Sequence, residues 1–116
     1  MDYRAKLDRL LDRMGGLYLA SDLIEAVHVG EMQCLAENDS VAITRIAQYP
    51  RAKALEIIGA VGALEDLRRL HDKVLDFADE VNAGVVLAFG RKGWIPDAEA
   101  RGWRIKAKSY LYAKEM

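Results

Sequence analysis

The feature that most constrains the fold is an apolar strand followed by a long amphipathic helix and a second apolar strand. The segment Lys53–Val61 is apolar on both faces except for Glu56, which is typical of a central strand covered on two sides. Apolar residues then recur at helical spacing from Leu64 to Val81, and Val85–Phe89 follows as a strand. Such a βαβ unit is right-handed in nearly all proteins, and its two strands are parallel.

The chain before this unit has the pattern of a hairpin. Met32–Ala36 and Val41–Gln48 are rich in strand-forming residues, and residues 38–40 between them are typical of a turn. Residues 49–51 interrupt the second strand with a proline, which has no amide proton to donate. We therefore expect an α/β (α+β) fold with a mixed, mostly antiparallel sheet and one right-handed βαβ crossover.

Helices are expected towards both ends of the chain. The segment Tyr3–Met14 carries apolar residues at helical spacing and is followed by two glycines. A second helix is expected from Ser21, whose hydroxyl can cap its free amides, to Gly30. Pro96–Ala100 is expected to form a short helix because proline fits the first turn, and Trp103–Ala113 a final strand.

These elements predict one domain over residues 1–116, a length that suits a single core. Residues 1–30 form its N-terminal helices, and residues 31–116 form the sheet with the crossover helix and a C-terminal helix and strand. The apolar residues expected to be largely buried come from the central strand, the long helix and the strand after it: Ile57, Leu67, Leu70, Val74, Val86 and Phe89.

Charge and cysteine content exclude several classes of function. Lys and Arg total 17 and Asp and Glu 18, so the net charge of -1 gives no general attraction to nucleic acid or an anionic membrane. Cys34 is the only cysteine, which excludes an internal disulfide and a thiolate metal site. No segment resembles a signal peptide or a membrane span. We expect a cytoplasmic protein with no metal site and with neither membrane nor nucleic acid among its partners.

The order of the predicted elements resembles the GCN5-related N-acetyltransferase fold. The most specific local likeness is the ending GRKGWIPDAEARGWRIKAKSYLYAKE, which is similar to that family's last helix, the step into its last strand and that strand. Gly102-Trp103 stands where the family usually has Gly-Phe. The short chain and its GRKGW segment also resemble small acetyltransferase-like proteins of tailed phages and prophages.

The resemblance implies an acetyl-CoA site where the two parallel strands separate. Family members carry a loop with the pattern Gln/Arg-x-x-Gly-x-Gly/Ala, whose amides bind the pyrophosphate at a helix N-terminus. Here the matching segment is residues 58–64. It lacks the Gln or Arg, and the strand passes almost directly into the helix. We therefore expect a degenerate site and no cofactor. If the chain is an enzyme, acetyl-CoA would contact four residues of this segment: Gly59, Gly62, Ala63 and Leu64.

The resemblance also implies a tyrosine that protonates the leaving thiolate, five positions before the aromatic of the Gly-Phe step. That position is Ala98 in this chain. The general acid is therefore missing from its expected place.

Glu56 is the candidate general base. Burial in a central strand would raise its pKa towards neutral pH if it faces the site. The alternative is that Glu56 faces solvent or pairs with a lysine or arginine. His71 and His28 are expected to be packed or surface residues rather than catalytic ones.

Arg91, Lys92 and Trp94 are the candidate interaction residues. They follow the fourth strand, where open α/β sheets commonly bind ligands, and they combine charge with a large aromatic, as interface hot spots do. The alternative is a solvated loop. Trp94 and Trp103 are either core anchors or part of a partner surface.

Two hypotheses for function remain. The first is a non-catalytic acetyltransferase-like domain that acts as a structural or interaction protein, as a virion component or assembly factor of a phage that is put together in the bacterial cytoplasm. Its partners would be phage particle proteins or copies of itself. The second is an acetyl-CoA-dependent N-acetyltransferase. The fold alone does not decide between them, because function resides in sites.

Overall fold

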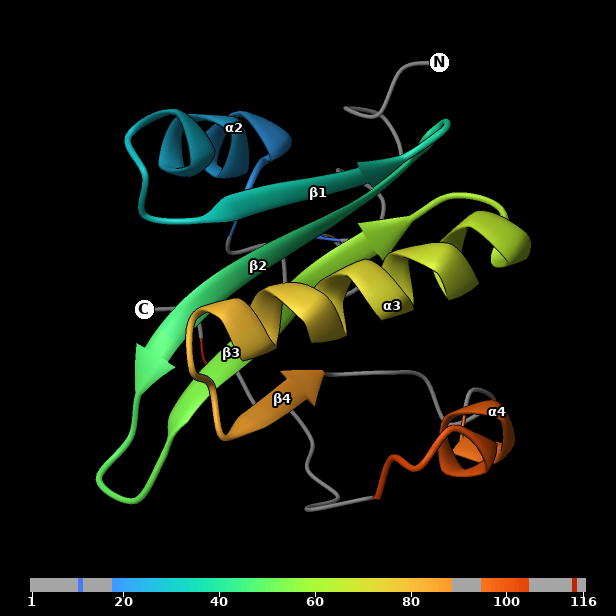
Figure 1. Cartoon of the computed structure of the whole chain (residues 1–116). Helices are drawn as coiled ribbons and strands as arrows, with labels where there is room; N and C mark the ends of the chain where they lie inside the picture. The colour runs from blue at the N-terminus through green and yellow to red at the C-terminus, as the bar shows by residue number, and fades with distance from the viewer. Residues whose placement is uncertain (1–10, 12–17, 89–94, 105–113, 115–116) are drawn as a thin grey trace.

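The computed structural model describes residues 11, 18–88, 95–104 and 114, and its centre is a four-stranded sheet in the order β1-β2-β3-β4 (Figure 1). The strands are β1 (Gln33–Glu37), β2 (Ser40–Gln48), β3 (Lys53–Val61) and β4 (Val85–Ala88). β1 and β2, and β2 and β3, pair antiparallel, whereas β3 and β4 pair parallel. The predicted mixed sheet is confirmed.

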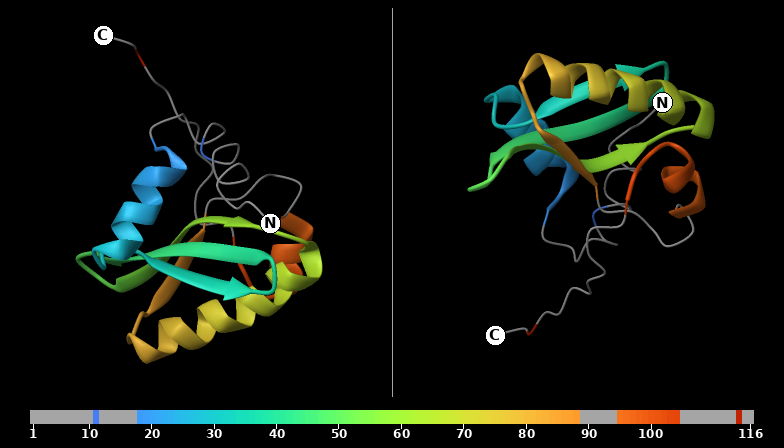
Figure 2. Two further views of the ribbon diagram at one scale, coloured as in Figure 1. Left: turned by 90° about the horizontal axis from the view of Figure 1, so that it is seen from above. Right: turned by 60° about the horizontal axis from the view of Figure 1, so that its bottom comes forward.

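Helix α3 (Leu64–Glu80) links β3 to β4 across one face of the sheet, and α2 (Ala20–His28) lies on the other face (Figure 2). With α3 in front of the sheet, Figure 1 shows the crossover to be right-handed, as predicted. A short helix, α4 (Ile95–Ala100), begins one residue before its predicted start.

The predicted start of α2 is wrong. The N-cap is Leu19 rather than Ser21, which lies within the helix. The backbone amide of Leu19 donates to Asp22 Oδ2 at 2.8 Å, so a carboxylate in the first turn fixes the start of the helix in place of a hydroxyl.

The core has one apolar cluster on each face of the sheet. Beneath α3, its buried members are Ala42, Leu55, Leu70, Val74 and Ala78. On the face that α2 covers, they are Leu11, Ala20, Leu23, Met32, Val41 and Ile43. Leu11 is helical, and it is the one described residue of the helix predicted over Tyr3–Met14.

The predicted core residues divide into three groups. Leu70 and Val74 are each 2% exposed, which confirms their prediction. Leu67, Ile57 and Val86 are half-buried against the same cluster. Phe89 lies outside the described residues, as do residues 105–113 of the predicted final strand, whereas Trp103 and Arg104 are described and are not in a strand.

A β-bulge interrupts the pairing of β2 with β3. Ile43 is opposite Gly59 and Thr44 is opposite Ile57, so Ile58 has no partner on β2. The last pair between β3 and β4 is Ile57 with Ala88, and the bulge therefore follows that pair by one residue. Bulges re-aim side chains and are frequent next to binding sites.

Leu70→Ala should lower the free energy of unfolding by about 2–5 kcal/mol, because the change leaves a cavity beneath α3. Urea denaturation measures this change. Leu75→Ala is the matched control, since this leucine of the same helix is 41% exposed and its loss should cost much less. Equal losses in the two variants would contradict the assignment of the buried face of α3.

Candidate functional site

Glu56 lies on the face of the sheet opposite α3, in a polar cluster. Its side chain is 6% exposed, and its Oε2 lies 2.7 Å from the Nη2 of Arg45, the residue opposite it on β2. The Tyr49 hydroxyl donates a hydrogen bond to Glu56 Oε1. Both carboxylate oxygens are therefore engaged within the chain.

The pKa of Glu56 is lowered, whereas a role as general base would have required a raised one. The hydrogen bond from Tyr49 is the largest cause, and that from Arg45 adds to it, so that together they outweigh the effect of burial. The same contact with Glu56 raises the pKa of Tyr49. Pairing with an arginine was the alternative for Glu56, and the structure contains that pair. A general base needs a pKa nearer to neutral and a free oxygen.

Gly62 lies at the end of β3, where the chain turns into α3. Its φ is +143°, a conformation that side chains rarely adopt, and a Cβ placed there would overlap the side chain of Ser40 and lie 2.8 Å from its Cα. The missing side chain therefore allows β2 to begin against the turn that leads into α3. This close approach is a packing role for a glycine predicted to contact acetyl-CoA.

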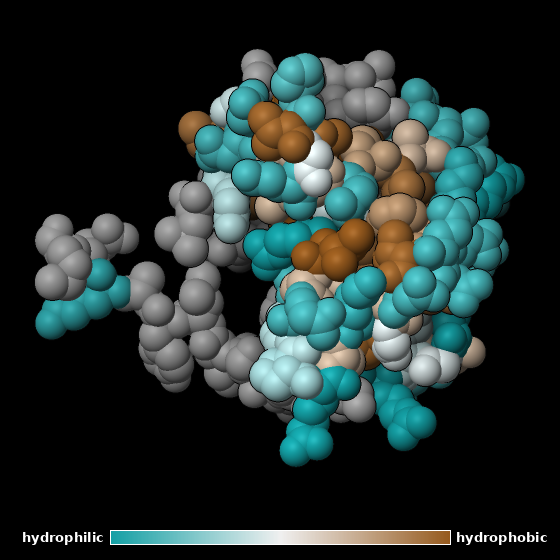
Figure 3. Space-filling model, turned by 60° about the vertical axis from the view of Figure 1, so that its left-hand side comes forward, coloured by the Kyte–Doolittle hydropathy of each residue, from teal (hydrophilic) through white to brown (hydrophobic). Residues whose placement is uncertain are grey.

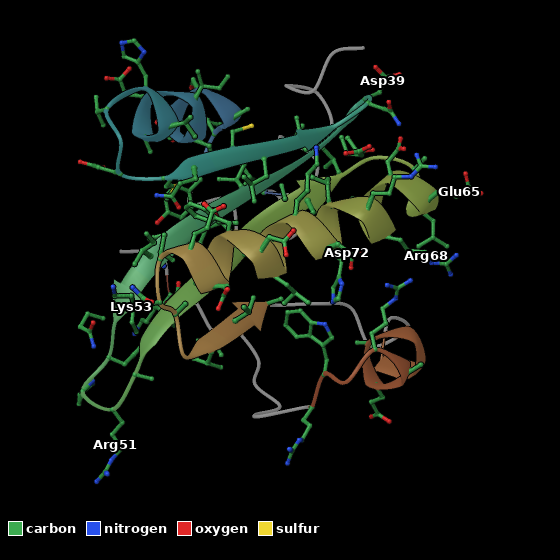
Figure 4. All side chains as sticks on the ribbon, viewed as in Figure 1. Asp39, Arg51, Lys53, Glu65, Arg68 and Asp72 are labelled. Atoms are coloured by element: carbon green, nitrogen blue, oxygen red, sulfur yellow. The ribbon has the colours of Figure 1, made fainter. Side chains whose placement is uncertain are left out.

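Asp66 joins the first turn of α3 to the β1–β2 hairpin. Its Oδ1 accepts from Asn38 Nδ2 at 2.9 Å, and its Oδ2 accepts from Ser40 Oγ at 3.3 Å. Glu65 is a second carboxylate in this turn, and Figure 4 places it at the same end of the molecule as Asp39 of the hairpin. Two carboxylates offset the positive end of the helix dipole and oppose a phosphate there.

The four residues that would contact acetyl-CoA if the chain were an enzyme do not form one loop. Gly59 is buried in the sheet, opposite Ile43. Gly62 is packed against Ser40, as described above. Ala63 is the N-cap of α3 and Leu64 its first residue, and only these two lie at the helix N-terminus.

His71 of α3 holds the segment that follows α4. Trp103 Nε1 donates to His71 Nε2 at 2.9 Å, and the two rings are 5.9 Å apart between centroids. His71 Nδ1 lies 3.4 Å from Asp72 Oδ1. The histidine is therefore packed, as expected, and Trp103 is half-buried against its own chain.

Three further predictions concern the interaction residues, a metal site and a membrane span. Arg91, Lys92 and Trp94 lie outside the described residues. The part of the chain that the structure describes contains no group of three or more His, Cys, Asp or Glu side chains placed to hold a metal ion. No helix among the described residues is long and apolar enough to cross a membrane.

Sequence reasoning missed Arg45 and Tyr49 as partners of Glu56, although a signal existed. Pairing β2 with β3 across the turn that follows Gln48 places Arg45 opposite Glu56. The sequence gives a weaker indication of the contacts between Asp66 and the hairpin, because only the crossover brings the first turn of α3 to the hairpin.

Comparison with solved structures shows that the fold is acetyltransferase-like. An acetyltransferase of Trypanosoma brucei aligns with a TM-score of 0.64 and 11% identity over 82% of this chain and 78% of that one. The BH1408 protein of Bacillus halodurans, solved as a tetramutant, aligns with a TM-score of 0.66 and 8% identity over 86% and 77% of the chains. Wild-type TTHA1254 of Thermus thermophilus aligns with a TM-score of 0.58 and 15% identity over 90% and 86%. No protein-family model and no curated protein sequence matches the chain.

Glu56→Gln should lower the free energy of unfolding at neutral pH by roughly 1.5–3 kcal/mol, because hydrogen bonds to a charged group are lost. A lowered pKa means that the ionised carboxylate stabilises the fold above its unfolded pKa of about 4.3, and that this contribution disappears as the pH falls through the folded pKa. The difference between wild type and variant should therefore shrink in acid.

Denaturant titrations at several pH values measure this difference. Glu31→Gln, a change at an exposed glutamate, is the control for removing a carboxylate. A gap between wild type and Glu56→Gln that stays constant from neutral to acid pH would contradict the ionised assignment.

Proposed function

We propose that this chain is an acetyltransferase-like domain that lacks acetyl-CoA-dependent catalysis and acts as an interaction or structural protein. The observation that carries the proposal is the first turn of α3, where Asp66 is bound to the β1–β2 hairpin. The resemblance implies a pyrophosphate site at this helix N-terminus, and here a carboxylate of the same turn binds two side chains of the hairpin.

The residues present at this turn do not fit the diphosphate of acetyl-CoA. A phosphate needs free amides and a positive surround, but Glu65 and Asp66 bring two carboxylates to the same turn. The side chain of Ser40 fills the space beside Gly62 that a closely approaching ligand would need.

The polar cluster at Glu56 also supports a structural role. A base that accepts a proton from an amine needs a free lone pair directed at the substrate. Both oxygens of Glu56 instead accept hydrogen bonds from Arg45 and Tyr49. Separating a buried carboxylate from these partners costs free energy. The ion pair therefore supports a structural role for Glu56 and not a role in proton transfer.

The interaction surface that we propose includes Arg91, Lys92 and Trp94. The partners that we propose are other proteins or copies of this chain. A role in a phage particle, assembled in the bacterial cytoplasm, is the most specific form of the proposal, and it rests on the resemblance of the short chain and its GRKGW segment to small phage proteins. Figure 3 shows separate apolar areas among hydrophilic residues on one side of the molecule. Leu19, Ile24 and Val29, in and beside α2, are each more than half exposed.

A working acetyl-CoA-dependent N-acetyltransferase is the second candidate. The bulge at Ile58, one residue beyond the last β3–β4 pair, favours it, because bulges are frequent next to active sites. The likeness to the trypanosome acetyltransferase also favours it. In this case Glu56 would have to separate from Arg45 before it could act as a base.

Titration calorimetry with acetyl-CoA should give no saturable heat, because carboxylates and Ser40 occupy the turn that would hold the diphosphate. The same titration with an acetyltransferase of known activity is the positive control. A micromolar dissociation constant for this chain, together with transfer of the acetyl group to an amine, would favour the second candidate.

The double change Arg91→Glu with Lys92→Glu should abolish assembly with the partner or with other copies and leave the unfolding temperature unchanged. Sedimentation and incorporation into the native particle measure assembly, and circular dichroism measures folding. Arg51→Glu with Lys114→Glu makes the same charge change at exposed positions and is the control. Equal assembly of both double variants would refute this surface.

A further inference from the structure

The outer edge of β1 carries backbone groups that point away from β2. The loop between Glu37 and Ser40 has two residues, so these two residues form a hydrogen-bonded pair, and such pairs alternate along an antiparallel ladder. Leu35 and Gln33 therefore bond to β2, whereas the amides and carbonyls of Cys34 and Ala36 face outward. Both outward-facing residues are exposed, and no other strand of the described residues pairs with β1.

Lys73 of α3 covers part of this edge. Its Nζ donates to the carbonyl oxygen of Ala36 at 2.8 Å and lies 2.7 Å from Glu37 Oε2. The helix reaches the edge because α3 contacts β1 as well as β2 and β3. An outward carbonyl that would accept from a neighbouring strand is thus occupied by a lysine of the same chain.

We infer that the outer edge of β1 is a pairing surface for a second copy of this chain, and that Lys73 keeps it closed. Exposed strand edges pair readily with other chains, and natural proteins block them with charged side chains, lysine above all. This role does not depend on the surface proposed above at Arg91, Lys92 and Trp94. It assigns Lys73 to the control of self-association.

The sequence of β1 suits antiparallel pairing with itself. Centred on Leu35, the pairing places Cys34 of one copy opposite Ala36 of the other, and both are small residues with outward backbone groups. Gln33 falls opposite Glu37, so no two like charges meet. In this arrangement each Ala36 carbonyl accepts from the Cys34 amide of the other copy, and this is the carbonyl that Lys73 occupies.

Lys73→Met keeps the aliphatic stem over the sheet and removes the ammonium. It should tighten self-association by roughly tenfold or more, because one acceptor is freed in each of two copies. Sedimentation velocity over a series of concentrations measures the change. Lys73→Arg keeps a charged donor and should behave as wild type.

Lys53→Met is the matched control. Lys53 also donates to a backbone carbonyl, that of Val81 at 3.0 Å, but this carbonyl belongs to the C-cap of α3 and not to the edge of β1. Its loss should leave self-association unchanged. Equal association of the Lys73→Met and Lys53→Met variants would overturn the inference.

Ala36→Pro tests the strand itself. Proline removes the outward amide of residue 36, and edge strands tolerate proline where the amide faces outward. Added to Lys73→Met, it should return the chain to the wild-type association constant. A Lys73→Met variant that associates no more tightly than wild type, or one whose tighter association survives Ala36→Pro, would overturn the inference. Circular dichroism confirms that each variant is folded, and Lys73→Gln replaces Lys73→Met if that variant is not.

Discussion

The close approach of Ser40 to Gly62 fixes how the chain leaves the sheet and enters α3. A side chain at Gly62 would overlap Ser40, so the start of β2 and the end of β3 meet only because residue 62 is glycine. Asp66 then binds Asn38 and Ser40 from the first turn of the helix. These contacts direct α3 across the sheet, where it covers the core and carries Lys73 to the edge of β1.

The same turn is the basis of our proposal that this acetyltransferase-like fold does not transfer acetyl groups. Acetyl-CoA binding requires that the helix N-terminus stay open to a diphosphate. Here Asp66 of that turn binds the hairpin, and Glu65 is a second carboxylate beside it. In the function that we propose, this turn stabilises the fold and does not bind a cofactor. Glu56 shows the same preference, since Arg45 and Tyr49 hold it as an ionised structural group.

The sequence predicted the architecture better than the chemistry. The apolar run of Lys53–Val61 and the periodicity that follows it identified β3, α3 and the parallel pairing, because burial on two faces leaves a clear pattern. The pattern left open whether Glu56 faces a binding site or pairs with a basic residue, and the structure contains its ion pair with Arg45. The bulge at Ile58 changes which face of the sheet the residues beyond it occupy. The amino-acid composition of the strand does not indicate such a bulge. The hairpin contacts of Asp66 depend on the crossover, which brings distant segments together.

The stability of Gly62→Ala tests this account most directly. Gly30→Ala is its control, because Gly30 also has a positive φ, +84°, but open space around it. Overpacking costs about 1–3 kcal/mol beyond the backbone strain that both variants share. The account predicts that Gly62→Ala lowers the free energy of unfolding by that much more than Gly30→Ala, and that adding Ser40→Gly recovers part of the loss. Equal losses in the two alanine variants would show that Gly62 is not needed for packing, which would contradict the account.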